Sequence, residues 1–317
     1  MKKTLIIGGS GFIGSRLIDI LDKSYIINFD KNKSFSHDNI TFIGNILNKD
    51  DLEEIFKKNI DQVILLAAEH RDDVNPTSLY YDVNVQGTQN VLDIMSKNEI
   101  NKILFTSSVA VYGLNKKNPD ETHPLEPFHD YGKSKMMAEE LILEWCKENK
   151  KHCATIIRPV VVFGEENRGN VYNLFKQINK KFFLMIGSGN NKKSMAYVGN
   201  LASFIKNRMK SGKGYEIYNY ADKPDLSMNE LVLLCEKSLN FKVPRIKVPY
   251  LFGMTSAFII KIIFLMFGKK SSINPLRVKK FCATTQFDSS KAFSTKFSPP
   301  FTLKESIRKT LNNEFKS

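Results

Sequence analysis

Short apolar runs alternate with helical patterns along the first 160 residues of the chain. Five runs rich in β-branched and aromatic residues are predicted as strands: 4–7, 25–29, 62–66, 102–106 and 154–157. Four segments between them repeat apolar residues at helical spacing: 12–21, 51–58, 78–98 and 131–149. Strands that alternate with helices long enough to cross over predict βαβ units and a parallel sheet.

The alternation ends near Gly164, where loops, mixed elements and the turn-like sequence Gly187-Ser188-Gly189 take over. A chain of 317 residues with 42% apolar content is long enough for one large domain and a smaller lobe. We therefore expect an α/β fold with a Rossmann-type, doubly wound parallel sheet over residues 1–164. A smaller substrate-binding lobe is expected over 165–317, with an element or two returning to the sheet.

The cysteines and the N-terminus argue against several classes of protein. The four cysteines show no CxxC pairing and no metal-like spacing with the five histidines, so neither a disulfide framework nor a metal site is expected. The first apolar run is interrupted at Gly8 and is too short for a signal peptide. We expect a protein of the reducing cytoplasm.

The net charge of +14 is concentrated near the C-terminus. Residues 242–317 contain 15 Lys and Arg against 3 Asp and Glu, which is a net charge of +12. Such a basic segment favours an anionic partner, either a membrane surface of anionic phospholipid or a substrate that carries a diphosphate. Nucleic acid is not expected, because no aromatic-basic interleaving and no nucleic-acid-binding motif accompany the charge.

A glycine-rich turn follows the first predicted strand. Gly8, Gly11 and Gly14 form a GxxGxxG pattern that runs into a helix through Phe12 and Ile13. Such a turn lets a pyrophosphate approach the backbone at a helix N-terminus, where free N–H groups point at it. These residues are therefore predicted to bind a dinucleotide.

Asp30 indicates which dinucleotide is bound. It lies 22 residues after Gly8, at the end of the second predicted strand. A carboxylate there accepts hydrogen bonds from both hydroxyls of the adenosine ribose and repels a 2′-phosphate, so NAD is favoured over NADP. Lys31 and Lys33 follow directly and could soften this preference.

Tyr131 and Lys135 form a YxxxK pair, which on a helix lies on one face, one turn apart. A nearby ammonium favours the phenolate, so the pair predicts a tyrosine of lowered pKa that takes and returns a hydroxyl proton. Ser108 follows the predicted strand 102–106, at the sheet edge where α/β folds bind ligands, and is predicted to hydrogen-bond the reacting oxygen. YxxxK alone is common on helices; its combination with the glycine turn and Asp30 carries the prediction.

Together these residues resemble the extended short-chain dehydrogenases/reductases, as do Arg158-Pro159 and Val162-Phe163-Gly164. The resemblance implies that further residues contact the NAD cofactor: Asn45, Ile46, Leu66, Ala67 and Ala68, together with Tyr131 and Lys135. In the sugar-nucleotide dehydratases of this family an Asp-Glu pair follows the serine, whereas this chain has Val109-Ala110. A dehydratase is therefore not expected, which leaves 4-epimerisation or reduction of a 4-keto sugar.

Four runs resemble a bacterial subgroup of these enzymes that acts on a lipid-linked amino sugar: 67–74, 167–174, 193–198 and 277–288. The subgroup interconverts N-acetylglucosamine and N-acetylgalactosamine on diphospho-undecaprenol, in the synthesis of surface polysaccharide such as O-antigen. The resemblance implies that Asn170, Lys193 and Arg277 contact substrate, with the two cations gripping the diphosphate. Thr285 would leave room for a 2-acetamido group, and Ser108 would contact the sugar.

An apolar segment over 250–267 contains one charge, Lys261, and is followed by Lys269 and Lys270. It is marginal for a membrane span, which needs roughly 20 apolar residues. We expect the region near 250–270 to form an interfacial helix on an anionic membrane, at the inner face of the cytoplasmic membrane. The alternative is a helix buried within its own lobe or against the partner of a homodimer.

Three other functions stay open. A soluble 4-epimerase of UDP-N-acetylglucosamine or UDP-glucose would share the catalysis and differ in the carrier of its nucleotide-linked sugar. A 4-keto-sugar reductase would consume NADH stoichiometrically. A regulator that senses the dinucleotide would not need the full set of Ser108, Tyr131 and Lys135.

Overall fold

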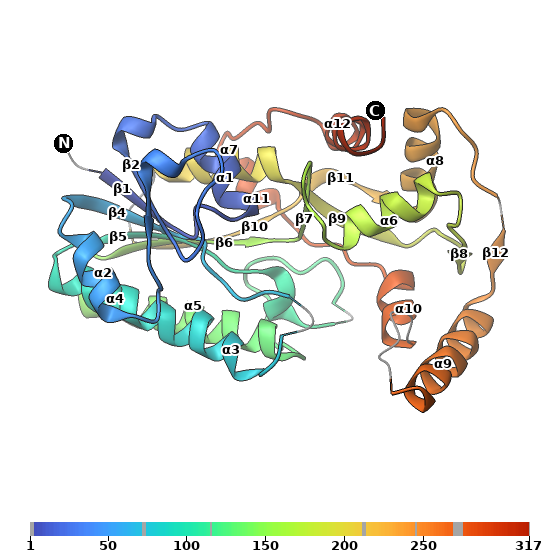
Figure 1. Cartoon of the computed structure of the whole chain (residues 1–317), viewed down its shortest axis with the longest axis horizontal. Coiled ribbons are helices and arrows are strands. Elements are labelled where there is room, and N and C mark those ends of the chain that lie inside the picture. The colour runs from blue at the N-terminus through green and yellow to red at the C-terminus, as the bar shows by residue number, and fades with distance from the viewer. Residues whose placement is uncertain are drawn as a thin grey trace. The chain divides into compact units, whose positions relative to one another are not determined.

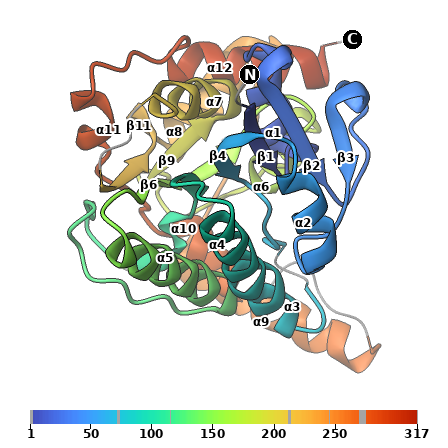
Figure 2. The ribbon, with the colours of Figure 1, turned by 90° about the vertical axis from the view of Figure 1, so that its left-hand side faces the viewer.

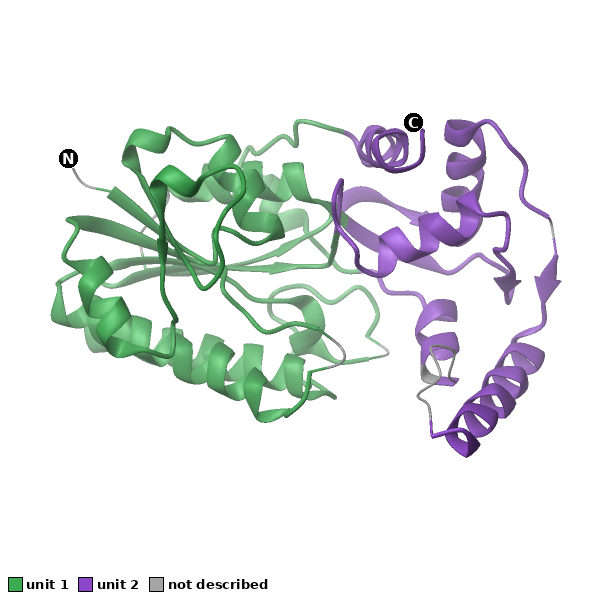
Figure 3. Cartoon of the chain, in the orientation of Figure 1, with its two compact units in different colours: residues 1–162, 196–221, 287–301 green, residues 163–195, 222–286, 302–317 purple. Residues whose placement is uncertain are grey.

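The computed structural model describes residues 3–71, 74–114, 116–210, 214–244, 246–268 and 275–316. The chain forms two compact units (Figure 3). The first comprises residues 1–162, 196–221 and 287–301, and the second comprises residues 163–195, 222–286 and 302–317. Lys269 and Lys270, which were expected to hold the apolar helix on a membrane, lie outside the described residues, as do Asp72 and Asp73.

A seven-stranded sheet forms the centre of the first unit (Figure 1). Its order is β10-β6-β5-β4-β1-β2-β3, and every neighbouring pair is parallel. The strands are β1 (Lys3–Ile7), β2 (Ile26–Asp30), β3 (Thr41–Ile43), β4 (Ile60–Leu65), β5 (Lys102–Thr106), β6 (Cys153–Pro159) and β10 (Tyr215–Tyr220). The order 3-2-1-4-5-6 is that of the doubly wound dinucleotide-binding sheet, so the predicted Rossmann-type α/β class is confirmed.

Helices cover both faces of this sheet (Figure 2). Successive side chains of a strand point to opposite faces, so Leu5 and Ile7 of β1 pack into one core and Ile6 packs into the other. The helices on the Leu5 side are α2 (Lys49–Phe56), α4 (Gly87–Lys97) and α5 (Asp130–Glu148). Those on the Ile6 side are α1 (Phe12–Asp19), α7 (Val198–Arg208) and α11 (Ser290–Ser294). Burial on both faces explains the unbroken apolar runs of the sequence.

The strands predicted in the first 160 residues are confirmed with boundaries shifted by two residues at most. The predicted helix over 78–98 is interrupted: α3 (Ser78–Tyr81) leads into a π-helical turn over Asp82–Gln86, and α4 follows. β10 was not predicted, because Glu216 and Asn219 interrupt its apolar pattern. It pairs with β6 in the first unit, as part of the later chain that returns to the sheet.

The second unit combines short strands with helices. The strands are β8 (Met185–Ile186), β9 (Lys192–Tyr197), β11 (Asp222–Ser227) and β12 (Lys247–Val248), and β7 (Val161–Phe163) joins β9 at the start of this part of the chain. The helices are α6 (Asn170–Asn179), α8 (Met228–Leu239), α9 (Tyr250–Met266), α10 (Pro275–Cys282) and α12 (Leu303–Phe315). α8 packs against α6 and α12, and capping boxes at Ser227 and Thr302 begin α8 and α12.

Helix α9 is apolar on all sides and largely exposed. Gly253 and Ala257 are its buried residues, whereas Leu251 is 74% and Met266 is 80% exposed. Gly253 allows close packing on β8, because a Cβ there would lie 2.6 Å from Cγ2 of Ile186. No helix in the described parts of the chain is long and apolar enough to cross a membrane.

A buried ion pair lies at the carboxyl end of β6 in the first unit. Arg158 and Glu139 of α5 are both at least 97% buried, and Nε and Nη2 of Arg158 donate to Glu139 at 2.9 and 2.5 Å. Nη1 donates to the hydroxyl of Tyr112 at 2.7 Å, and that hydroxyl donates to Oδ1 of Asn219 at 2.8 Å. The chain of contacts ties α5, the turn after β5 and β10 to β6.

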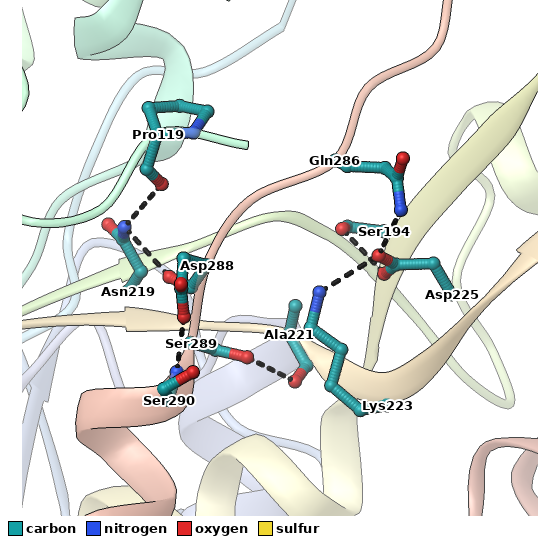
Figure 4. A network of polar contacts seen from close by, with 10 residues as sticks. All are labelled: Pro119, Ser194, Asn219, Ala221, Lys223, Asp225, Gln286, Asp288, Ser289 and Ser290. Carbon is teal, nitrogen blue, oxygen red and sulfur yellow. Dashed lines mark hydrogen bonds and ion pairs between the residues drawn. The ribbon is translucent and has the colours of Figure 1, made fainter. Parts of the chain in front are cut away.

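Asn219 continues this network to two loops (Figure 4). Its Nδ2 donates to the carbonyl oxygens of Pro119 and Asp288 at 3.2 and 3.0 Å. Asp288 in turn accepts from the Ser290 N–H at the start of α11. The network therefore joins polar groups from six segments of the first unit: β6, α5, the turn after β5, β10 and the two loops.

Replacing Arg158 should destabilise the protein more than removing an exposed cation. In Arg158→Met the carboxylate of Glu139 stays buried without its partner, so we expect the free energy of unfolding to fall by about 3–5 kcal/mol. Lys97→Met, which removes an exposed ion pair with Glu53, is the control and should cost below about 1 kcal/mol. Urea titration followed by circular dichroism compares the two; equal losses would contradict the role given to Arg158.

Candidate active site

The predicted cofactor and catalytic residues follow neighbouring strands of the first unit. β1 and β4 are neighbours, and β5 follows β4, so their carboxyl ends meet at one edge of the sheet. The chain turns in opposite directions from β1, towards β2 on one side and β4 on the other. Ligands of open α/β sheets bind at this switch point.

The three glycines of the turn after β1 are required for different physical reasons. Gly8 has φ +91°, and a Cβ there would lie 2.4 Å from the Ala67 backbone nitrogen. A Cβ at Gly14 would lie 2.4 Å from Cα of Gly9. A Cβ at Gly11 would meet only the Gly8 carbonyl oxygen, at 3.3 Å. Packing therefore requires Gly8 and Gly14, whereas the bare backbone of the exposed Gly11 suits close approach of a ligand.

The N-terminus of α1 fits an anionic group. Gly11 is its N-cap and supplies no side-chain hydrogen bond. Phe12 and Ile13, the first residues of the helix, are half-buried. The N–H groups and the positive dipole end of such a helix attract phosphate, so these residues fit the pyrophosphate of NAD.

Asp30 ties the glycine turn to the end of β2. Its Oδ2 accepts from the Ser10 N–H at 3.0 Å, and its Oδ1 accepts from the Asn32 N–H at 2.9 Å. A carboxylate offers about four acceptor sites, so two bonds leave capacity for the hydroxyls of a ribose. Asp30 is held in place by the backbone and fits the ribose of NAD.

The other predicted cofactor contacts surround the same edge. Leu66 and Ala67 both donate backbone N–H groups to the Ile7 carbonyl, at 2.8 and 2.9 Å, which fixes the turn after β4 beside Gly8, and Ala68 follows half-buried. The amide oxygen of the exposed Asn45 accepts from Leu47 N–H at 3.0 Å. Ile46 is buried.

Ser108 and Tyr131 meet in the structure. Ser108 lies at the end of β5, and its Oγ accepts from the Ala110 N–H at 3.1 Å. A hydrogen bond joins its side chain to the phenol of Tyr131, near the start of α5. Lys135, one turn further along α5, is 1% exposed, and its Nζ lies 4.0 Å from the centre of the Phe105 ring.

The expected lowering of the phenol pKa is wrong for the protein alone. Burial raises the pKa of Tyr131 above its usual value, and the hydrogen bond with Ser108 opposes this only in part. Burial also lowers the pKa of Lys135 to about 7, although the charge of Glu139 acts the other way. A lysine that is only partly charged at neutral pH stabilises a phenolate weakly, so desolvation decides the pKa of Tyr131.

Three residues that position this group were not predicted from the sequence. A Cβ at Gly132 would lie 2.6 Å from the Ala110 carbonyl oxygen, so this glycine lets α5 approach the Ser108 turn. Nδ1 of His129 accepts from the Gly132 N–H at 3.0 Å and caps α5. Buried Asn84, in the π-helical turn, donates to the Ser134 hydroxyl at 2.9 Å. The glycine inside YxxxK is the one signal that the sequence offered.

The predicted substrate residues of the second unit lie in three places. Lys193 of β9 forms a parallel bridge with Thr285, and the Ser194 N–H donates to the Thr285 carbonyl at 2.9 Å. Arg277 is exposed on α10, and Asn170 is the exposed first residue of α6. The structure thus brings Lys193 and Thr285 together.

Lys193 has a partner that the resemblance did not imply. Its Nζ donates to the carbonyl oxygens of Lys280 and Ala283 at 2.9 and 2.6 Å, at the C-terminal end of α10. Burial lowers its pKa to about 8. Two of its three N–H donors therefore hold the last carbonyls of α10, which leaves one donor for a phosphate.

Asp225 fixes the neighbouring segment in the second unit (Figure 4). Its carboxylate accepts from the Ser194 hydroxyl at 2.7 Å, from Nε2 of Gln286 at 2.9 Å and from Nζ of Lys223 at 2.9 Å. These bonds hold β9, β11 and the residue after Thr285 together.

Comparison with known proteins relates the chain to sugar epimerases. The NAD dependent epimerase/dehydratase family matches residues 4–221. The N-acetyl-alpha-D-glucosaminyl-diphospho-ditrans,octacis-undecaprenol 4-epimerase of Escherichia coli O157:H7 is 54% identical over 98% of this chain and 95% of its own. A putative UDP-glucose 4-epimerase of Methanocaldococcus jannaschii is 33% identical over 75% of this chain and 83% of its own.

Solved structures share the fold. UDP-glucose 4-epimerase of Thermotoga maritima with UDP-glucose has a TM-score of 0.77 at 20% identity and covers 98% of both chains. UDP-glucuronic acid 4-epimerase of Bacillus cereus in complex with NAD has a TM-score of 0.76 at 20% identity, again over 98% of both chains.

Because Gly11 and Gly14 have different roles, their replacement by alanine should have different effects. Gly11→Ala should fold normally and bind NAD at least about tenfold more weakly, about 1.4 kcal/mol, because the new methyl occupies the approach of the pyrophosphate. Gly14→Ala should lower the free energy of unfolding by about 1–3 kcal/mol, because its methyl overlaps the turn. Calorimetric titration with NAD and urea unfolding separate the two effects. NAD affinity unchanged in Gly11→Ala would contradict the assignment.

Proposed function

The chain belongs to the NAD-dependent epimerase/dehydratase family, and from this premise we propose that it is a 4-epimerase of a lipid-linked amino sugar. It would interconvert N-acetylglucosamine and N-acetylgalactosamine on diphospho-undecaprenol, in the synthesis of surface polysaccharide. The contact between Ser108 and Tyr131, one turn from buried Lys135, carries the proposal. The Escherichia coli relative supports diphospho-undecaprenol as the carrier of the sugar, because the sequence similarity extends over both units.

The cofactor of this family is NAD, which when bound supplies a reversible hydride acceptor for the sugar C4. Asp30 would hold its adenosine ribose, and the bare backbone of Gly11 at the N-terminus of α1 would hold its pyrophosphate. The carboxylate of Asp30 would repel a 2′-phosphate, which favours NAD over NADP.

The side chains of the first unit would move the proton. Tyr131 would take the proton of the sugar 4-hydroxyl as C4 becomes a ketone and return it when the other epimer forms, so that no net oxidation results. Ser108 would donate a hydrogen bond to the same oxygen. The half-buried Val109 and Ala110 that follow carry no carboxyl group, so no acidic side chain at these positions could catalyse the elimination of water.

We also propose that α9 places the enzyme on the inner face of the cytoplasmic membrane. Ile263 of α9 is 46% exposed and Phe267, which caps the C-terminus of α9, is 75% exposed, and such apolar side chains of a surface helix insert between lipid headgroups. Lys261 is exposed on the same helix, and the C-terminal part of the chain carries a net charge of +12 from residue 242 onwards. Cations of this kind attract anionic lipid.

Replacing the acid/base group tests the reaction. Tyr131→Phe should lower turnover by about 10²–10⁴-fold and leave NAD affinity unchanged, because only the phenolic hydroxyl is lost. Tyr81→Phe, whose hydroxyl donates to Asp130 at the start of α5, is the control and should stay active. Radiolabelled N-acetylglucosamine on diphospho-undecaprenol or on UDP is converted, and the released sugar is separated by chromatography. Faster turnover of the UDP-linked sugar would make the enzyme a soluble epimerase instead.

Removing apolar side chains from α9 tests the membrane surface. The double variant Ile263→Ser and Phe267→Ser should bind vesicles rich in phosphatidylglycerol at least about tenfold more weakly, since each loses buried apolar area. Phe182→Ser, at an 82% exposed position outside α9, is the control and should bind normally. Co-sedimentation with vesicles measures binding; absence of binding by the unmodified protein would contradict the proposal.

A further inference from the structure

Helices α9 and α10 of the second unit pack together (Figure 1). Their side chains line an apolar groove of about 440 Å³. Its lining residues are Met254, Thr255, Phe258, Ile259 and Pro275. The volume falls within the roughly 300–1,000 Å³ of sites that bind small molecules.

The side chains that line the groove favour a hydrocarbon ligand. The one polar side chain among its described lining residues is Thr255, whose hydroxyl donates to the Leu251 and Phe252 carbonyls at 3.1 Å. That hydroxyl proton is already bonded within its own helix, so no side-chain donor among the described lining residues remains to recognise a phosphate, a base or a sugar. The groove therefore gains free energy only by burying apolar surface.

Exposed cations follow the groove residues along both helices. Pro275 lines it and is the first residue of α10, and the exposed Arg277 and Lys279 follow within the next two turns. Lys261 is exposed on α9, after the groove residues Phe258 and Ile259. A ligand that complements this surface has a hydrocarbon part joined to an anionic part.

We propose that this groove binds the isoprenoid chain of the lipid carrier next to its diphosphate. The inference rests on the proposed function and deepens it, because the enzyme would recognise the chain itself as well as the sugar. Each buried methylene contributes a factor of about four to affinity, so a few isoprene units in an open groove should contribute about tenfold or more.

The remaining apolar surface of α9 lies outside the groove. Leu265 and Met266 are 59% and 80% exposed and do not line it. A second copy of the protein is a weaker occupant, since a stable protein interface covers about 800 Å² on each partner and the described part of the groove has five lining residues. Recognition of the isoprenoid and adsorption to the membrane therefore use different residues of α9, so the two can be measured separately.

Water-soluble substrates of two chain lengths test the proposal without a membrane. One carries N-acetylglucosamine diphosphate on a farnesyl group of three isoprene units, and the other carries it on an ethyl group. In vesicle-free buffer the unmodified enzyme should convert the farnesyl compound with a kcat/KM at least about tenfold higher, chiefly through a lower KM. Phe258→Ala with Ile259→Ala should remove this preference and keep activity on the ethyl compound. Leu265→Ala with Met266→Ala, the matched control, should retain the preference.

Thermal unfolding and NAD titration establish that each variant is folded before its kinetics are compared. Equal kcat/KM for the two compounds in the unmodified enzyme, or equal loss in the groove and control variants, would overturn the inference. An oligomer lost only in the groove variant, with chain preference intact, would assign the groove to a second copy and also overturn it. Turnover of UDP-N-acetylglucosamine without turnover of either diphosphate compound would instead remove the proposed function, and the inference with it.

Discussion

The ion pair between Arg158 and Glu139 is the constraint on which the candidate site depends. Burial alone would lower the pKa of Arg158, but the hydrogen bonds and charge of Glu139 raise it, so the guanidinium stays charged inside the first unit. The pair holds α5, which carries Tyr131 and Lys135, against the end of β6. Through Tyr112 it also holds the turn that begins at Ser108. Three catalytic candidates from two segments thus keep one geometry.

The same pair sets the electrostatics around Lys135. Glu139 lies one turn after Lys135 on α5, and its charge favours the ammonium, while burial disfavours it more strongly. Because Arg158 already neutralises Glu139, little negative charge is left to keep Lys135 protonated. The sequence showed the spacing of the YxxxK motif but could not show this neutralisation, since Arg158 comes from β6.

Local patterns were readable in the sequence, and distant contacts were not. The five predicted strands appear as apolar runs because both faces of a parallel sheet are buried. The short edge strand β3 was not among them, since Phe42 and Ile43 are exposed and it has no such run. The glycine turn and Asp30 follow from spacing along one βαβ unit. Tyr112 and Asn219, however, are 107 residues apart, and no short-range pattern indicates their hydrogen bond. Asn84 likewise reaches Ser134 across 50 residues.

The second unit shows how a resemblance can identify a residue without its contacts. Lys193 was expected to grip a diphosphate, and the structure shows it holding the last carbonyls of α10. This bond fixes the helix that begins at the rim of the apolar groove and carries Arg277. Lys193 therefore positions the end of α10, the helix that carries Arg277.

The exposure of α9 could not be read from its sequence. A helix that is apolar on all sides has no amphipathic pattern, so it is typical of a buried core or of a membrane span. Within the described chain, α9 is not part of a buried core, because only its residues Gly253 and Ala257 are buried. No described helix is long and apolar enough to cross a membrane. Leaving so many large apolar side chains in water is unfavourable, and the exposed Lys261 on the same helix favours a partner that also carries negative charge. The proposed membrane surface, with its anionic headgroups, would cover these apolar side chains and attract the lysine.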